Sequence, residues 1–345
     1  MNATSTLKID GYAHISPPRY TEALRNEFPG FYRQILGITP PLFDMEARFR
    51  VMDAFAPIAQ VLTVGPVPPL EHFADPGRAV GLARLANDEM AELVAKYPDR
   101  FVAAIALLPM NDIEAALAEA DRAIRELGFK GIYVHSNING RPLDAPEFLP
   151  FFEKMAAYDL PIYIHPWRGN DFPDYPVEDE SKYAIASTFG WPYETTAAMT
   201  RIVFSGLFER FPNLKVVTHH GGGMVSFYEQ RIVQHYGQFE SSYHDYSEIS
   251  SRLKKAAIEY YKMFYNDTAI HGNTPALMLA YSFWGPDKLI FAADMPLGDP
   301  AFGMRSYAET IGAIEAMDIS DEDKRKILGG NVARLLKLAP QAGRG

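Results

Sequence analysis

Histidine and aspartate residues of this sequence recur directly after short apolar runs. They are His14, His135, His165, His219, His220, Asp267 and Asp294. Imidazole nitrogens and a carboxylate that converge on one point form a site for zinc or a similar divalent metal, with one position open for water or substrate. A single histidine of this kind is more often a packed core residue, but several at the ends of successive runs predict a metal-dependent active site.

The most informative stretch runs from Leu214 to Met224. A β-branched segment leads into His219 and His220, and three glycines then permit a tight turn. Neighbouring side chains of a strand point to opposite faces, so only one of the two histidines is expected to face a given cavity. The stretch therefore predicts a strand that delivers one histidine to a site at its carboxyl end.

These polar residues need elements that bring them to one end of the fold. The sequence predicts eight strands, at residues 7–15, 58–64, 101–108, 130–135 and 160–166, in the stretch from Leu214, and at 263–268 and 288–294. It predicts helices over 46–55, 77–97, 113–127, 147–158, 194–211, 251–262, 274–284, 302–317 and 321–338. Connections of this length imply right-handed crossovers and a parallel sheet. The expected fold is a closed (β/α)8 TIM barrel, one domain over residues 1–345. Inserted loops are expected at the barrel mouth, among them an irregular stretch from Pro17 to Phe43 and a second loop from Trp167 to Trp191.

Composition limits the class of protein. The chain has 345 residues and a net charge of −10 that no long charged run accounts for, so nucleic acid is not an expected partner. It has no cysteine, which excludes disulfides, thiolate metal sites and cysteine nucleophiles. The first residues lack an apolar signal segment and no run is long enough for a membrane span. A cytoplasmic enzyme is expected.

Short motifs in order along the chain carry a family resemblance. They are Ile9-Asp10, Ala47–Asp53, Leu127–Gly131, His165-Pro-Trp167, Pro192–Thr196, Gly206–Lys215, His220–Gly223, Asp294–Gly298 and Gly330-Asn331. With them the chain resembles the amidohydrolase superfamily (amidohydrolase-related family 2). Within it, the resemblance is to the metal-dependent decarboxylases of the aminocarboxymuconate semialdehyde and γ-resorcylate type.

The resemblance implies roles for particular residues of this chain. His14, His165 and Asp294 correspond to metal ligands, and His220 corresponds to the catalytic histidine beside the metal, with Asp294 also taking part in proton transfer. His219 is expected to pack away from the metal. The implied cofactor is one divalent metal ion, Zn or Mn. Residues implied or expected to contact substrate are Arg48, Arg50, Trp167, Phe189, Trp191 and, from a neighbouring subunit of a homodimer or dimer of dimers, Arg231.

The chain departs from the family pattern at Tyr12, where members usually carry histidine or glutamate. A phenol has a pKa near 10 and is a poor ligand unless the metal stabilises the phenolate. Three consequences are open: a tyrosinate ligand, a three-ligand site, or a weak or lost metal. A retained metal with Tyr12 near it is the favoured interpretation, and Asp10 is expected to be structural.

The expected activity is non-oxidative decarboxylation of an aromatic, hydroxybenzoate-like or conjugated carboxylic acid, in which the metal acts as Lewis acid and template. The alternatives are a metal-dependent hydrolase of the same superfamily, acting on a lactone, an amide or a carbon–carbon bond, and a hydratase. A metal-free binding protein is the alternative that is not an enzyme.

Overall fold

The protein is described from a computed structural model. The structure describes residues 7–29, 39–65, 68–236, 240–241, 244–245, 252–297, 299 and 301–339. Residues 30–38 of the loop expected between Pro17 and Phe43, the first residue of the helix expected over 251–262, and Gly298 lie outside the described residues.

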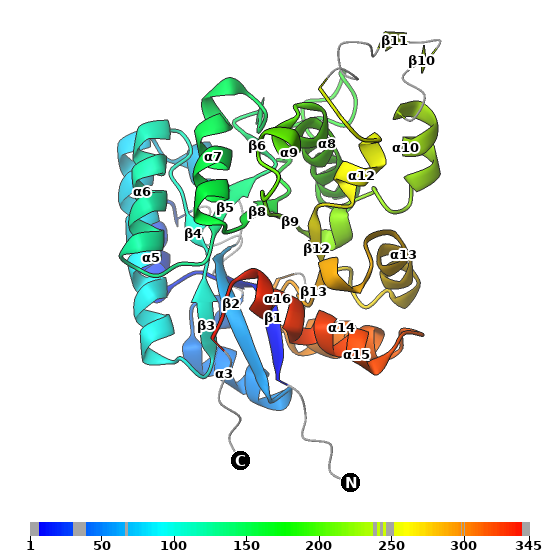
Figure 1. Cartoon of the computed structure of the whole chain (residues 1–345). Helices are drawn as coiled ribbons and strands as arrows, with labels where there is room; N and C mark the ends of the chain where they lie inside the picture. Colours follow the sequence, from blue (N-terminus) through cyan, green and yellow to red (C-terminus); the bar gives the residue numbers. More distant parts are fainter. Residues whose placement is uncertain are drawn as a thin grey trace.

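All eight predicted strands are present and run parallel (Figure 1). Their order is β1–β2–β3 in one sheet and β4–β5–β8–β9–β12–β13 in the other. The bounds are β1 (Lys8–Ile15), β2 (Ile58–Val64), β3 (Phe101–Ala104), β4 (Ala106–Leu107), β5 (Ile132–His135), β8 (Ile162–His165), β9 (Val216–Thr218), β12 (Tyr265–Asp267) and β13 (Leu289–Ile290). Two antiparallel pairs lie outside this series: β6 (Asn137–Ile138) with β7 (Arg141–Pro142), and β10 (Glu240–Ser241) with β11 (His244–Asp245).

Backbone hydrogen bonds join the two sheets into a barrel. The predicted strand 101–108 forms as β3 and β4 because Ile105 donates to the Leu62 carbonyl of β2 (2.9 Å) while Ala106 donates to the Gly131 carbonyl before β5 (3.0 Å). On the other side, the Gly11 amide donates to the Phe291 carbonyl (2.8 Å), so the chain after β13 meets β1. The predicted closed (β/α)8 barrel is therefore confirmed.

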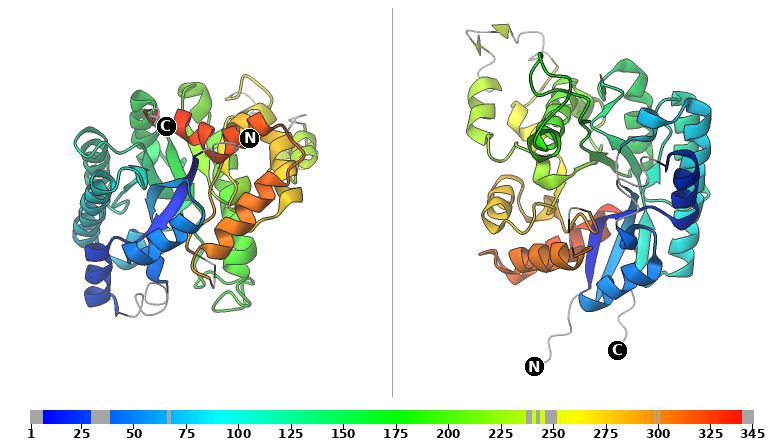
Figure 2. Two further views of the ribbon diagram at one scale, coloured as in Figure 1. Left: turned by 90° about the horizontal axis from the view of Figure 1, so that it is seen from below. Right: turned by 180° about the vertical axis from the view of Figure 1, so that it is seen from behind.

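Helices surround the strands, as Figure 2 (left) shows from below. They are α1 (Pro18–Glu27), α3 (Met45–Ala54), α4 (Leu70–Phe73), α5 (Pro76–Lys96), α6 (Ile113–Arg125), α7 (Leu149–Tyr158), α8 (Trp191–Phe204), α9 (Leu207–Arg210), α10 (Glu229–Tyr236), α12 (Ala257–Tyr261), α13 (Thr274–Trp284), α14 (Met304–Glu315), α15 (Asp321–Arg325) and α16 (Asn331–Leu335). Short 3-10 or π turns are η2 (Pro40–Leu42), η3 (Pro146–Phe148), η4 (Ala186–Gly190), η5 (His220–Gly222), η6 (Pro286–Lys288) and η7 (Lys326–Gly330). With both faces of the strands covered, β2 is buried along its whole length, as its apolar sequence predicts.

The helices differ from the prediction in several places. The stretch after Pro17 was expected to be irregular, yet it contains α1, because Pro18 stands at the start of that helix, where its missing N–H costs nothing. The helix expected over 194–211 is divided into α8 and α9 by Gly206, whose φ is 77°. The prediction also missed α4 and α10. The helix expected over 251–262 forms only as α12, and the helix expected over 321–338 is divided into α15, η7 and α16. Within the described residues, no helix combines the length and apolar character needed to cross a membrane.

Candidate metal centre

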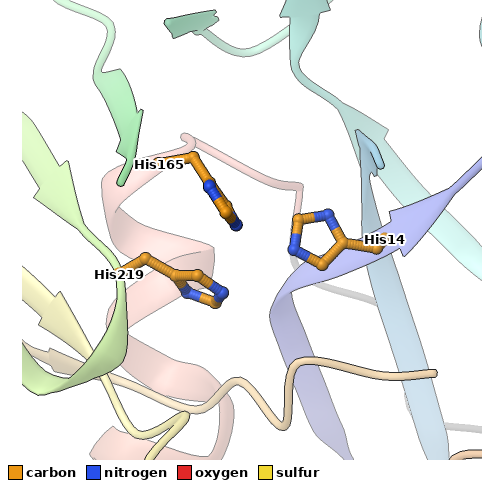
Figure 3. Close-up of side chains that lie close together, drawn as sticks. All are labelled: His14, His165 and His219. Atoms are coloured by element: carbon orange, nitrogen blue, oxygen red, sulfur yellow. The ribbon is translucent and has the colours of Figure 1, made fainter. Parts of the chain in front are cut away.

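Three histidines from different strands converge at the carboxyl end of the barrel (Figure 3). His14 lies near the end of β1, His165 is the last residue of β8, and His219 follows β9. One ring nitrogen of each lies within 4.8 Å of the other two. Asp294 completes the cluster: its Oδ1 is 3.2 Å from His14 Nε2 and 3.3 Å from His219 Nε2. The structure thus brings together His14, His165 and Asp294, and adds His219.

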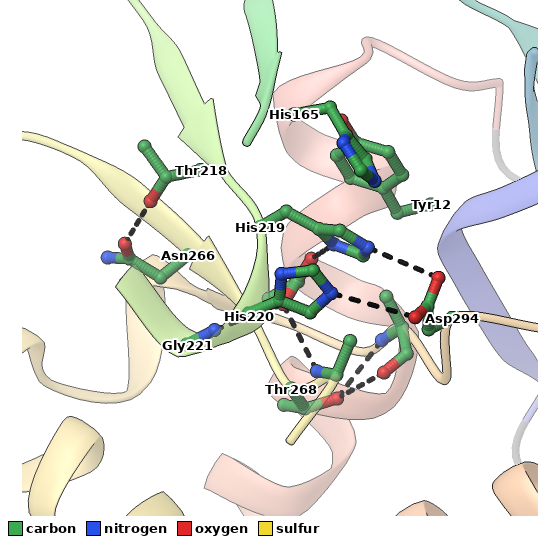
Figure 4. A network of polar contacts seen from close by, with 12 residues as sticks. Tyr12, His165, Thr218, His219, His220, Gly221, Asn266, Thr268 and Asp294 are labelled. Atoms are coloured by element: carbon green, nitrogen blue, oxygen red, sulfur yellow. Dashed lines mark hydrogen bonds and ion pairs between the residues drawn. The ribbon is translucent and has the colours of Figure 1, made fainter. Parts of the chain in front are cut away.

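His219 and His220 both face this centre (Figure 4), so the expectation that His219 packs away is wrong. The alternation rule fails because β9 ends at Thr218 and His220 takes a left-handed backbone conformation with φ of 55°. As a result, His220 Nε2 also reaches Asp294, at 3.6 Å from Oδ2. Asp294 has a φ of 57°. Left-handed backbone at non-glycine residues is uncommon and concentrates at functional sites.

The donor set fits one divalent metal ion. The buried Nε2 of His14 makes no aligned hydrogen bond to the described residues, although Asp294 Oδ1 lies 3.2 Å away. His165 Nδ1 is 2.7 Å from the Pro166 carbonyl, which can only accept, so Nδ1 carries the proton and Nε2 is left for a cation. Imidazole nitrogens with one carboxylate suit Zn²⁺ and Mn²⁺ alike.

Tyr12 is buried beside the cluster. Its ring stacks on the His219 ring, with centroids 4.2 Å apart and planes at 21°. Its hydroxyl has no hydrogen-bond partner in the part of the chain that the structure describes. Burial, with Tyr133 and Asp267 nearby, raises the pKa of Tyr12 well above its ordinary value. Asp10 accepts from the Tyr12 amide (3.1 Å), and burial raises its pKa to about 6.

The charges of the cluster are strongly coupled. Burial opposes ionisation of Asp294, but His14, His219 and His220 around it hold its pKa well below the usual value. Burial also disfavours the charged form of His219, yet the carboxylates of Asp267 and Asp294 outweigh it and raise the pKa of His219 to about 10. These carboxylates favour positive charge at the centre, which is the electrostatic condition for binding a cation.

Of the three aromatic residues expected at the substrate, Trp191 lies nearest the cluster. Its ring is stacked on His220, with centroids 6.1 Å apart and planes at 18°, and meets the His165 ring edge-on at 5.5 Å. Trp167 lies farther from the cluster, and its ring centroid is 6.4 Å from that of His135. A cavity of about 460 Å³ opens beside Trp167, without the clustered histidines in its wall. Phe189 is 64% exposed and contributes no ring to the cluster.

The expected arginines lie away from this opening. Arg48 is completely buried and donates to the carbonyls of His14 (2.7 Å) and Pro41 (3.0 Å) and to the side chain of Gln60 (2.7 Å). It therefore holds the end of β1 through Nε and Nη1, while its buried Nη2 has no hydrogen-bond partner among the described residues. Arg50 points outward, with 64% of its side chain exposed. Neither arginine lines the cavity beside Trp167, and their expected role at the substrate stays a prediction.

Asp267 has a structural role that its sequence position alone did not predict. Its Oδ2 contacts His219 Nδ1, and both side chains are fully buried. The position of Asp267 at the end of a predicted strand indicated that it lies near the site, but it did not indicate that His219 is its partner. His135 stands at the end of β5, where its Nε2 is 3.2 Å from the Tyr133 hydroxyl. Among the described residues, two groups of side chains could hold a metal ion, and His135 belongs to neither. The groups are His14, His165 and His219, and His219, His220 and Asp294.

Known proteins resemble this chain over most of its length. It is 32% identical over 314 residues to 2-amino-3-carboxymuconate-6-semialdehyde decarboxylase of Dictyostelium discoideum. The match covers 90% of this chain and 80% of that protein. It is 32% identical over 301 residues to γ-resorcylate decarboxylase of Polaromonas sp., covering 85% of this chain and 87% of that protein.

A solved structure is also similar. A dihydroxybenzoic acid decarboxylase of Polaromonas sp., with bound manganese and the inhibitor 2-nitroresorcinol, superposes with a TM-score of 0.77. The two sequences are 29% identical, and the match covers 96% of this chain and 97% of that one. The amidohydrolase family profile matches residues 9–338. The chain therefore belongs to the amidohydrolase family.

Proposed function

We propose that this protein is a metal-dependent, non-oxidative decarboxylase of an aromatic, hydroxybenzoate-like or conjugated carboxylic acid. The observation that carries the proposal is the cluster of His14, His165, His219 and Asp294, with His220 beside it under the Trp191 ring. The expected class of carboxy-lyase is confirmed by the relatives, which are decarboxylases of aromatic or conjugated acids.

A divalent ion bound at this centre would supply Lewis acidity to the substrate oxygens. The Trp191 ring, parallel to His220, offers a flat surface for a planar substrate. In the reaction the bond between the ring carbon and the carboxylate breaks, CO₂ leaves, and the electron pair stays on the ring carbon. A proton must then reach that carbon.

His220 is the proposed proton donor. Its side chain is 13% exposed, whereas that of His219 is fully buried, so His220 lies on the open side of the pair. Burial and the neighbouring His219 lower the pKa of His220, whereas Asp294, 3.6 Å from His220 Nε2, orients the ring and opposes this lowering. This pairing supports general acid–base catalysis by His220.

The proposed assembly is a homodimer or dimer of dimers in which Arg231 reaches the neighbouring subunit's site. In its support, Arg231 is exposed on α10 beside apolar side chains that are also exposed, namely Phe227 (73%), Tyr228 (41%) and Val233 (41%). Mixing Arg231→Ala with His220→Asn subunits tests the exchange, because one intact site per mixed dimer should restore part of the activity. Two inactive variants that never complement each other would contradict it. The cytoplasmic location stays a prediction.

The activity is tested with protein loaded with Mn²⁺ or Zn²⁺ and a panel of hydroxybenzoates, measuring released CO₂ and the decarboxylated product. We expect CO₂ release that EDTA abolishes and that added metal restores, and slow carboxylation of phenols in bicarbonate. Cleavage of esters or lactones, or hydration of conjugated acids, without CO₂ release from the panel would contradict the proposal in favour of a hydrolase or hydratase.

A further inference from the structure

His219 lies among the metal-binding residues although the sequence-based ligand set leaves it out. Its ring nitrogen is within 4.8 Å of those of His14 and His165, and the three rings face a common centre (Figure 3). We propose that His219 is a metal ligand of this protein, and that Tyr12 supports the His219 ring without binding the metal. This inference rests on the metal-dependent function proposed above.

The Asp267 carboxylate holds His219 from the side away from the cluster. It contacts His219 Nδ1, and it is itself fixed because its Oδ1 accepts from the amides of Gly221 (3.3 Å) and Ala269 (3.1 Å). A carboxylate only accepts, so Nδ1 donates and Nε2 is the nitrogen that faces Asp294 and the cluster. Histidines that bind metals usually give their second N–H to a carboxylate or carbonyl in this way.

His220 lacks this support. Its Nδ1 is buried and has no hydrogen-bond partner within the described parts of the chain. Its ring is held instead by the stack on Trp191 and by Asp294. An imidazole fixed by a buried carboxylate suits a ligand, whereas one on the open side suits contact with substrate. The two adjacent histidines therefore divide these tasks.

Tyr12 contacts His219 through its ring. The planes of the two rings differ by 21° and their centroids lie 4.2 Å apart, so the phenol lies along one face of the imidazole and limits its rotation. A neutral phenol is a weaker metal donor than an imidazole nitrogen. The role that this contact assigns to Tyr12 is to position His219, and it depends on the aromatic ring and not on the hydroxyl.

The test measures metal affinity, which does not require turnover. Metal-free wild type, His219→Ala, His219→Gln and Tyr12→Phe are titrated with Mn²⁺ and Zn²⁺ against a competing chelator, with circular dichroism to verify folding. His135→Gln is the matched control, because it removes a strand-end histidine outside the ligand groups. Loss of a supporting residue typically weakens affinity about 10–100-fold, so loss of the ligand His219 should exceed about 100-fold.

Tyr12→Phe and His135→Gln should stay within a few-fold of wild type. Unchanged affinity in the His219 variants, or a loss in Tyr12→Phe as large as in His219→Ala, would overturn the inference. His219→Gln nearly preserves side-chain volume and keeps the test valid if His219→Ala does not fold.

Spectroscopy gives a second, independent reading. Pulsed EPR of the Mn²⁺ protein should detect one coupled histidine nitrogen fewer in His219→Gln than in wild type, and the Cu²⁺ protein should lack a tyrosinate charge-transfer band. Equal nitrogen counts, or such a band, would contradict the proposal. If wild type binds metal through His219 but releases no CO₂, the proposed function fails while this inference stands. If CO₂ is released but His219→Gln binds metal as tightly as wild type, the proposed function stands and this inference fails.

Discussion

The Tyr12 ring lies against the His219 ring, with the two planes 21° apart. The two residues come from β1 and from the end of β9, strands that do not pair with each other, so the contact crosses the barrel interior. It fixes a candidate ligand through packing alone. Tyr12, where the chain departs from the family pattern, therefore contacts His219, which the family's ligand set does not include.

Replacing Tyr12 by alanine should remove this packing. Large-to-small changes of a buried aromatic residue cost about 3–5 kcal/mol of unfolding free energy, because they remove apolar contacts and leave a cavity. Tyr12→Phe keeps the ring and should cost far less, since the hydroxyl has no partner among the described residues. Urea unfolding of the metal-free variants measures the difference. Equal losses would show that the hydroxyl, and not the ring, stabilises the fold.

Asp267→Asn should weaken metal binding. The amide carries no charge and has one acceptor oxygen, whereas Asp267 accepts from His219 at one oxygen and from the Gly221 and Ala269 amides at the other, so one of these donors must face the NH₂ group. The expected loss of Mn²⁺ affinity is about 10–100-fold, smaller than that of His219→Ala. Isothermal titration of the metal-free variant measures it. A drop in stability with unchanged affinity would instead assign Asp267 a purely structural role.

His220→Asn should separate catalysis from metal binding. Loss of a general acid typically lowers kcat by about 10²–10⁴-fold. Metal affinity should stay within a few-fold of wild type, because the proposed ligands remain. CO₂ release and metal titration on the same preparation check both parts. A variant that loses its metal would place His220 among the ligands.

Arg48→Met should destabilise the protein, and Arg50→Ala should not. Arg48 is buried and makes three hydrogen bonds, so its loss leaves unsatisfied carbonyls and should cost roughly 2–4 kcal/mol. Arg50 pairs with Glu46 at the surface, a contact that contributes about 0.5 kcal/mol or less. Chemical denaturation compares the two. An Arg48 variant with normal stability and only a raised KM would restore its expected role in substrate binding.

Glu71→Gln should stabilise the protein at pH 8 more than at pH 5. Glu71 on α4 is 8% exposed, and burial raises its pKa to about 7. Because this folded-state pKa exceeds the unfolded value, the neutral carboxyl contributes stability that is present at low pH and is lost as the pH rises toward 7. The isosteric amide does not ionise, so its advantage over wild type should grow by about 2–3 kcal/mol between the two pH values.

Urea unfolding of wild type and Glu71→Gln in parallel at each pH cancels the contributions of all other titrating groups. A difference between the two proteins that does not change with pH would mean that Glu71 ionises normally in the folded protein.

The sequence by itself determined the architecture and the end of the barrel that holds the site. Buried parallel strands need apolar residues on both faces, so runs such as 58–64 are recognisable without tertiary information, and β2 has those bounds. Polar residues directly after such runs, including His165 and Asp294, then had to meet at the carboxyl end, because all the strands of a barrel run the same way.

The tertiary structure decided which neighbouring residues meet. Alternation along a strand predicted that one of His219 and His220 faces away, but β9 ends before them and a left-handed residue turns both to Asp294. Helical periodicity could not tell whether Arg48 faces a pocket or the core, because the groups that bind it, from His14 to Gln60, lie on separate strands. Such contacts depend on where strands end and how helices pack, and local sequence patterns do not encode either.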